Sequence, residues 1–101
     1  MYYRYEAKNK NGEYEGIFSF FNPDERRYFN RFVKEPKWYA KNPNVESKCW
    51  FTEEGFVKYH HIIEELISNY DGFKDEIRLL KREKLDHIVC KGKIQCIELV
   101  V

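Results

Sequence analysis

Apolar positions between Cys49 and Tyr70 recur with the period of an α-helix. They fall on one stripe that comprises Phe56, Tyr59, His60, Ile63, Leu66, Ile67 and Tyr70, which is the i, i+3, i+4, i+7 spacing of a helix with a buried face. Thr52 is a good N-cap, and the two glutamates that follow it favour the positive end of the helix dipole. Asp71-Gly72 provides a stop, because glycine tolerates the left-handed cap position. We therefore expect the longest helix of the chain here, with other elements packed on it.

Residues 2–21 show the pattern of a β-hairpin. Asn11-Gly12 favours a type I′ turn, in which both turn residues take positive φ. A two-residue turn there would pair Lys10 with Glu13, Lys8 with Glu15, Tyr5 with Phe18 and Tyr3 with Phe20. Such pairs contribute about 0.2–1 kcal/mol each, and a shift of one residue would separate all of them. The sequence therefore predicts this register.

A second helix is predicted to begin after Asn22 and to run to about Glu35. Asn22 suits the N-cap, Pro23 the first helical position and Glu25 the third, while the following proline ends the helix. Its buried stripe would comprise Tyr28, Phe29, Phe32 and Val33. Residues 36–47 are expected to form a loop, and residues 48–51 a short strand that leads into the long helix.

The last third of the chain supplies the remaining strands. Residues 73–84 fit either a helix or an edge strand guarded by charges, and the strand is preferred because the sheet otherwise has few partners. Residues 85–101 are expected to form a hairpin about Gly92. With Gly92 as its left-handed residue, the hairpin pairs Ile88 with Ile94, Leu85 with Ile97 and Lys84 with Glu98, and other registers also fit. The expected fold is a single α+β domain over residues 1–101, with one antiparallel sheet (the N-terminal hairpin plus the C-terminal strands) packed against two helices.

Composition agrees with one folded domain, since 43% of the 101 residues are hydrophobic and 35% are charged. Sixteen of the eighteen aromatic residues lie before residue 60, so we expect a core that is aromatic on one side and aliphatic on the other. No apolar run approaches the length of a membrane span, and the polar, tyrosine-rich start is unlike a secretory signal. Three cysteines without a scaffold-like spacing indicate reduced thiols and a cytoplasmic protein.

Charge is separated along the chain although the net charge is only +1, which by itself steers the protein to neither nucleic acid nor membrane. Residues 26–41 carry six bases against Glu35 alone, and residues 53–76 carry seven acids against two lysines. Such segments suit a specific partner surface, and solvated helix faces produce the same pattern. The candidate binding residues are Arg27, Arg31, Lys34, Lys37 and Trp38. Nucleic acid is an alternative partner, since bases interleaved with Trp38 and Tyr39 could hold phosphates and stack a nucleobase.

Candidate chemistry is sparse. The soft metal ligands are Cys49, His60, His61, His87, Cys90 and Cys96, but no C-x-x-C pair is present, and His87 and Cys90 would point to opposite faces of a strand. Cys49 precedes a helix N-terminus, which can lower a thiol pKa, yet no orienting third group accompanies any histidine. We therefore expect no metal and no catalytic nucleophile.

One set of residues resembles the ADP-ribosyltransferase family in outline. The set comprises a first strand with Arg4 (YYRYE), the later strand and helix start CWFT-EEG, and a final hairpin with the acids Asp86 and Glu98. The resemblance implies that Arg4 would hold NAD, that Thr52 would line the pocket, and that Glu98 or Asp86 would align the ribose. Under this alternative the protein is an NAD-using enzyme or an inactive relative. Otherwise no cofactor is expected.

The style of the whole chain, with runs such as YYRYEAKNKNGEYEGIF and SKCWFTEEGFVKYHHIIEELI, is similar to that of small phage and mobile-element proteins. Many of these are anti-defence inhibitors of the anti-CRISPR type. The resemblance implies a compact domain that binds and blocks a bacterial defence protein, or a protein–nucleic acid complex, without catalysis. We therefore expect a non-enzymatic binding protein with a protein target.

Overall fold

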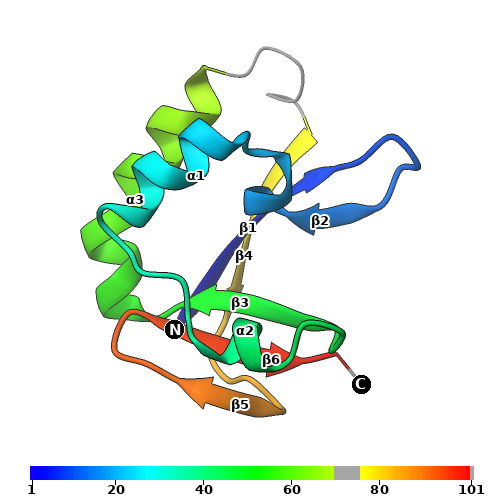
Figure 1. Cartoon of the computed structure of the whole chain (residues 1–101), viewed down its shortest axis with the longest axis vertical. Coiled ribbons are helices and arrows are strands. Elements are labelled where there is room, and N and C mark those ends of the chain that lie inside the picture. The colour runs from blue at the N-terminus through cyan, green and yellow to red at the C-terminus, as the bar shows by residue number, and fades with distance from the viewer. Residues whose placement is uncertain (70–75, 101) are drawn as a thin grey trace.

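The strands of this protein form one six-stranded antiparallel sheet. The computed structural model describes residues 1–69 and 76–100, and its strands are β1 (Tyr2–Lys8), β2 (Tyr14–Gly16), β3 (Ser47–Phe51), β4 (Ile77–Arg82), β5 (Ile88–Lys91) and β6 (Gln95–Leu99). The helical elements are a 3₁₀ helix, η1 (Ile17–Phe20), and the α-helices α1 (Pro23–Asn30), α2 (Trp38–Lys41) and α3 (Glu53–Ser68). The predicted α+β class with an antiparallel sheet is confirmed (Figure 1).

Strand β1 joins the two parts of this sheet. β4 pairs with it from Tyr2 to Ala7, whereas on its other side β2 pairs with the end of β1 and β3 with its beginning. The register between β1 and β3 is carried by the pair Tyr3–Phe51, and β6 and then β5 continue the sheet beyond β3. β1 and β4 run across the direction of β3, β5 and β6 (Figure 1), so the sheet bends where its two parts meet.

The predicted register of the N-terminal hairpin is wrong by one residue. Lys8 pairs with Tyr14 and Ala7 with Glu15, and β2 ends at Gly16, where η1 begins. The reason lies at Asn9, whose side-chain oxygen accepts hydrogen bonds from the backbone N–H groups of Asn11 and Glu13 at 2.9 and 3.0 Å. This lengthens the turn and leaves Gly12, at φ +81°, as its left-handed residue. The aromatic pairs that were predicted beyond Gly16 therefore do not form.

Helix α1 begins as predicted and ends early. The Asn22 side chain accepts from the Glu25 N–H at 2.9 Å, and the Glu25 carboxylate accepts from the Asn22 N–H at 2.8 Å, which completes a capping box with Pro23 in the first turn. The helix stops at Asn30 rather than near Glu35. Phe29 and Val33 are buried, but Phe32, expected in the core, is 44% exposed. The predicted loop after it contains the short helix α2.

Helix α3 is the longest helix of the described residues, as predicted, and its N-terminus is fixed to the β5–β6 turn. The Thr52 hydroxyl accepts from the Gly55 N–H at 3.0 Å, and the Thr52 N–H donates to the Ile94 carbonyl at 2.9 Å. The helix buries Ile62, Ile63 and Leu66, of which Ile62 was not in the predicted stripe. The predicted stop at Asp71-Gly72 and the stripe position at Tyr70 lie outside the described residues.

The C-terminal hairpin is present in another register. Strand β4 covers Ile77–Arg82, which confirms the preference for a strand there, while residues 73–75 lie outside the described part of the chain. In β5 and β6, Ile88 pairs with Glu98 and Cys90 with Ile97, with a bulge between Ile88 and Cys90. Gly92 is not left-handed, since Gly12 has the positive φ among the described glycines. The predicted pairs of this hairpin are therefore wrong.

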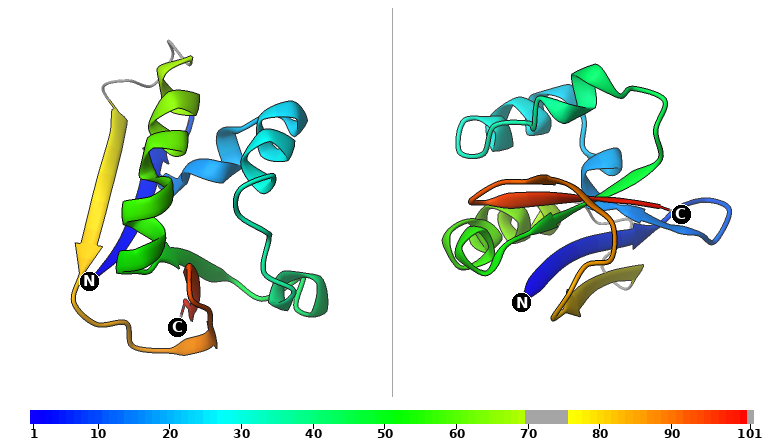
Figure 2. Two further views of the ribbon diagram at one scale, coloured as in Figure 1. Left: turned by 90° about the vertical axis from the view of Figure 1, so that its left-hand side faces the viewer. Right: turned by 90° about the horizontal axis from the view of Figure 1, so that it is seen from below.

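Two apolar clusters occupy the two faces of the sheet. The larger comprises Tyr5, Ala7, Ile17, Phe21, Phe29, Val33, Phe51, Ile62, Ile63 and Leu66, and it joins β1 and β3 to η1, α1 and α3. The smaller comprises Trp50, Leu85 and Cys96. Figure 2 shows α1 and α2 on one side of β3 and β6, with β4 on the other. The aromatic character of the first cluster and the aliphatic side of α3 follow the uneven distribution of rings along the chain.

Candidate functional site

A cleft of about 420 Å³ opens between the α1–α2 segment and strands β3 and β6. It is lined by Phe18, Ser19, Arg26, Phe29, Asn30, Val33, Lys34, Glu35, Pro36, Tyr39, Asn42, Pro43, Val45, Cys49 and Gln95. Its volume falls in the range of roughly 300–1,000 Å³ that is usual for ligand sites. The cleft exists because α1 ends at Asn30, so that the chain swings away from the sheet before it returns as β3. A second hollow, beside Arg4 and Gly16, has a volume of only about 10 Å³.

The walls of the cleft are mainly apolar. Phe18 and Phe29 pack against each other with ring centroids 4.6 Å apart, and Val33, which also lines the cleft, is buried. Val45, another lining residue, is 44% exposed. An apolar group that entered the cleft would bury its own surface and the exposed part of Val45, which is favourable by about 25 cal/mol per Å².

Gln95 supplies a polar group to the floor. It is the first residue of β6 and pairs with Phe51, so that its side chain lies on the same face as that of Cys49. The residue is only 9% exposed, yet its side-chain amide makes no hydrogen bond to any described residue. Among the described residues no fully enclosed side-chain oxygen or nitrogen lacks a partner, so the amide must reach solvent, and the cleft that Gln95 lines provides the opening.

Cys49 and Tyr39 lie beside Gln95 on the floor. Burial raises the pKa of the Cys49 thiol to about 11, and this effect outweighs the opposing influence of the Tyr39 hydroxyl and the Arg4 charge. Burial also raises the pKa of Tyr39, whose hydroxyl interacts with the side chains of Cys49 and Ser47. Both groups are therefore protonated and neutral near pH 7. The floor can donate and accept hydrogen bonds but does not present a thiolate.

The mouth of the cleft carries positive charge. Arg26 and Lys34 line it, with Glu35 as the acid among the lining residues, and neither base forms an ion pair with a described residue. The predicted binding residues Arg27, Arg31, Lys34 and Lys37 are all exposed on the same α1–α2 segment. Arg27 pairs with Asp24 on the helix surface, while Trp38 is half-buried against Tyr39, with ring centroids 5.7 Å apart. The basic segment thus meets the cleft at Arg26 and Lys34, whereas Arg27, Arg31, Lys37 and Trp38 do not line it.

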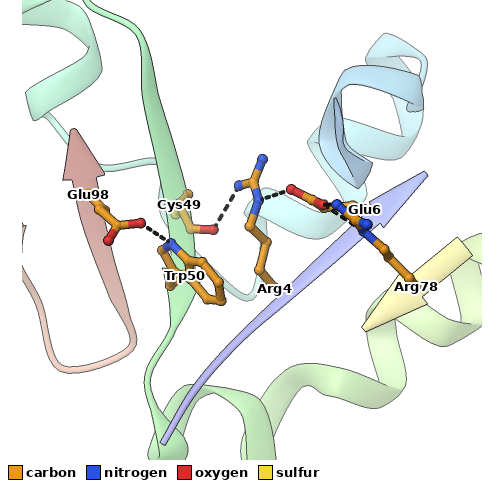
Figure 3. A network of polar contacts seen from close by, with 6 residues as sticks. All are labelled: Arg4, Glu6, Cys49, Trp50, Arg78 and Glu98. Carbon is orange, nitrogen blue, oxygen red and sulfur yellow. Dashed lines mark hydrogen bonds and ion pairs between the residues drawn. The ribbon is translucent and has the colours of Figure 1, made fainter. Parts of the chain in front are cut away.

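The four residues carried over from ADP-ribosyltransferases lie elsewhere. Arg4 donates to the Glu6 carboxylate at 2.8 Å and to the Cys49 carbonyl at 3.0 Å (Figure 3). Thr52 caps α3. Glu98 accepts from the Asp86 N–H at 3.1 Å on the opposite face of the sheet from Gln95. The structure thus brings the two acids together, and it places Arg4 and Thr52 in separate structural contacts, with Thr52, Glu98 and Asp86 outside the lining of the cleft.

Glu6 and Glu98 are buried carboxylates held by arginines. Glu6, 2% exposed, accepts from Arg4 and also from Arg78 at 2.7 Å. Burial works to raise the pKa of Glu6, but the hydrogen bonds and charges of the two arginines outweigh it and lower that pKa below its usual value. Arg78 in turn stacks on Tyr14, 3.7 Å from the ring centroid. Glu6 and Glu98 thus accept hydrogen bonds from neighbouring groups of the fold, which stabilise the structure.

The histidines and cysteines do not assemble into a metal centre. No group of three or more potential ligands that could hold a metal ion occurs among the described residues. His60 Nδ1 contacts the Phe56 carbonyl at 2.9 Å, within its own helix. Cys49 and Cys90 both pair with Ile97, one on each side of β6, so a strand separates them. The three thiols are free.

Comparison with known proteins gives no relative. No family model matches the chain, no curated protein matches it, and no solved structure matches its fold. In the described part of the chain, the helices are too short or too polar to cross a bilayer. The functional argument consequently rests on the cleft and on its charged rim.

Sequence reasoning singled out the basic segment but did not predict the cleft beside it. The basic residues of α1 are visible as a charge run, but the cleft depends on where α1 ends and on the pairing of β3 with β6. One signal for Gln95 was present, because a glutamine that opens the strand QCIEL, next to Cys96 and Ile97, is a polar residue at a core position. Tyr39 was considered as a stacking ring and Cys49 as a nucleophile, but nothing in the sequence places either of them beside Gln95.

Proposed function

We propose that the protein is a non-enzymatic binding protein of the cytosol that acts by stoichiometric contact with a protein target. The contact surface is the basic rim formed by Arg27, Arg31, Lys34, Lys37 and Trp38 together with the cleft beneath it. By resemblance of the whole chain to phage-type inhibitors, the target is a bacterial defence protein that is blocked by the contact.

The observation that supports this proposal most is that the basic residues and the apolar cleft share one mouth, at Lys34. Interfaces commonly combine a desolvated apolar centre with a polar rim. The arginines and lysines of the rim supply complementarity and faster association with an acidic partner. The protonated Cys49 thiol favours binding over nucleophilic catalysis, because the thiolate is the reactive form.

The test is an affinity pull-down from bacterial lysate with and without nuclease, read by mass spectrometry. The test variant reverses Arg27, Arg31 and Lys34 to glutamate together. The matched control reverses Lys10, Lys81 and Lys91, which are also exposed and form no ion pair with a described residue, so the two variants have the same net charge. We expect a nuclease-resistant protein partner that is retained by the control and lost by the test variant.

Full retention by the test variant would exclude the basic rim as the contact surface. Recovery that disappears with nuclease would favour the alternative partner, a nucleic acid, whose binding should weaken steeply as salt is raised. Thermal unfolding of each variant must accompany the pull-down. Exposed charges away from structural contacts usually change stability by less than about 0.5 kcal/mol, so both triple variants should remain folded.

A further inference from the structure

The amide of Gln95 is unusual for a group at a core position. Glutamine side chains are mostly exposed in folded proteins, and an amide that is cut off from water without a partner costs about 1–3 kcal/mol. Here the residue is nine-tenths buried, its amide has no partner among the described residues, and it lines a cleft wide enough for a ligand. An amide both donates and accepts hydrogen bonds, which matches the peptide group of a polypeptide backbone.

The residues around the amide indicate the chemical class of the ligand. The walls at Phe29, Val33 and Val45 suit an apolar side chain. Arg26 and Lys34 at the mouth suit carboxylates, and the segment from residue 26 to residue 41 holds six bases against Glu35. A single-stranded nucleic acid would need a free aromatic face for stacking, whereas the rings that line the cleft are packed within the fold, Phe18 against Phe29 and Tyr39 against Trp38.

We propose that the cleft receives an acidic peptide segment of the partner, with one apolar side chain between Phe29 and Val45, its backbone hydrogen-bonded by the Gln95 amide, and flanking carboxylates at Arg26 and Lys34. This inference rests on the proposed function and adds the chemical class of the ligand. In this arrangement the Gln95 amide hydrogen-bonds the peptide backbone. The Glu35 carboxylate repels the carboxylates of the peptide.

The experiment is a selection from a phage-displayed library of random twelve-residue peptides against the full chain, followed by affinity measurements with the enriched peptides as synthetic probes. We expect enrichment of peptides with at least two Asp or Glu residues that flank a Leu, Ile, Met or Phe. Their affinity should fall as the salt concentration rises, because exposed charge pairs are screened.

Three variants test the assignment of residues. Gln95→Met keeps the length of the side chain and removes its amide, so we expect unchanged or higher thermal stability and about tenfold weaker peptide binding, the loss that accompanies one unmade hydrogen bond to a desolvated group. Glu35→Lys should strengthen binding several-fold. Lys10→Glu, in the β1–β2 turn, is the control and should bind the peptides like the native chain.

Selection of no peptide, or of peptides that are neutral or basic, would overturn the inference. So would equal affinity of the native chain and the Gln95→Met variant. The pull-down separates this failure from failure of the proposed function. If the partner is lost on reversal of the basic rim but retained by Gln95→Met, the protein is a binding protein, and the proposal that a peptide binds in the cleft is wrong.

Discussion

Trp50 and Glu98 meet across the β3–β6 pair, where the indole Nε1 donates a hydrogen bond to the carboxylate Oε1 at 3.1 Å. The other carboxylate oxygen accepts from Arg82 at 3.2 Å and from the Asp86 N–H at 3.1 Å. One buried side chain thereby holds the β4–β5 connection against the sheet (Figure 3 shows its contact with Trp50). The carboxylate compensates for its burial through these three donors.

Replacement of Glu98 by alanine should therefore be strongly destabilising. The buried indole N–H would be left without an acceptor, and the partly buried bonds from the Asp86 N–H and Arg82 would be lost. Hydrogen bonds to charged groups contribute roughly 1.5–3 kcal/mol each. We expect a loss of about 2–4 kcal/mol in the free energy of unfolding, measured by urea denaturation. Asp86→Ala is the control: its side chain is exposed and pairs with Arg82 at the surface, so it should cost less than about 1 kcal/mol. Equal losses in the two variants would contradict this account.

Glu6 should make folding stability depend on pH in the acid range. Its pKa in the folded protein lies below the ordinary value of 4.5, so its contribution is present above the unfolded pKa and is lost as the pH falls through the folded pKa. Glu6→Gln, which leaves Arg4 beside an uncharged partner, should cost about 3 kcal/mol at pH 7. Chemical denaturation from pH 7 to pH 3 measures both, and the difference between native chain and variant should shrink on acidification. A difference that is constant with pH would show that Glu6 is not the titrating group.

Gly55 should not tolerate alanine, although alanine is the better helix former. A Cβ at this position would lie 2.2 Å from the Ile94 carbonyl oxygen, and backbone on both sides limits how far the two can separate. We expect Gly55→Ala to lower the free energy of unfolding by about 1–3 kcal/mol through overpacking. Val57→Ala, two residues later at a position that is 65% exposed, is the comparison and should be neutral or slightly stabilising. A stabilising Gly55→Ala would mean that the helix does not start against the β5–β6 turn.

Cys49 should react slowly with alkylating reagents at neutral pH. With a pKa of about 11, its thiolate fraction near pH 7.5 is about two orders of magnitude below that of an ordinary cysteine with a pKa near 8.5. Iodoacetamide labelling followed by peptide mass spectrometry measures the rate at Cys49 in the folded protein and in urea. We expect the rate in urea to be at least tenfold higher. Rapid labelling of the folded protein would restore Cys49 as a candidate nucleophile.

The sequence was most informative where a structure depends on neighbours in the chain. The capping box at Asn22 and the N-cap at Thr52 are made by residues three positions apart, so spacing alone predicts them. The N-terminal hairpin shows the limit of this reasoning. The Asn9 side chain accepts hydrogen bonds from two backbone N–H groups of the turn and so fixes its length. In the resulting register Tyr14 stacks on Arg78 of β4. Nothing near Tyr14 in the sequence indicates Arg78.

The candidate site shows the same division. The basic segment is a local charge run that the sequence shows directly, and its role as a binding surface stays a prediction. The cleft depends on the early end of α1 and on the facing of Cys49 and Gln95 in β3 and β6, which are consequences of tertiary packing that no single segment encodes. The polar network of Arg4, Glu6 and Arg78 likewise unites residues from the two ends of the chain.

The pairing of β1 with β4 also affects how this chain is made. β1 is synthesised long before β4, the strand that pairs with it from Tyr2 to Ala7, since Tyr2 lies opposite Arg82. Until residue 82 has been synthesised, one side of β1 presents unpaired backbone groups next to its aromatic side chains, a surface prone to association with other chains. Contacts between such distant segments also slow folding. The sheet of the nascent protein can therefore form only after β4 has been synthesised. A stall in translation before β4 would leave β1 exposed to aggregation or to binding by chaperones.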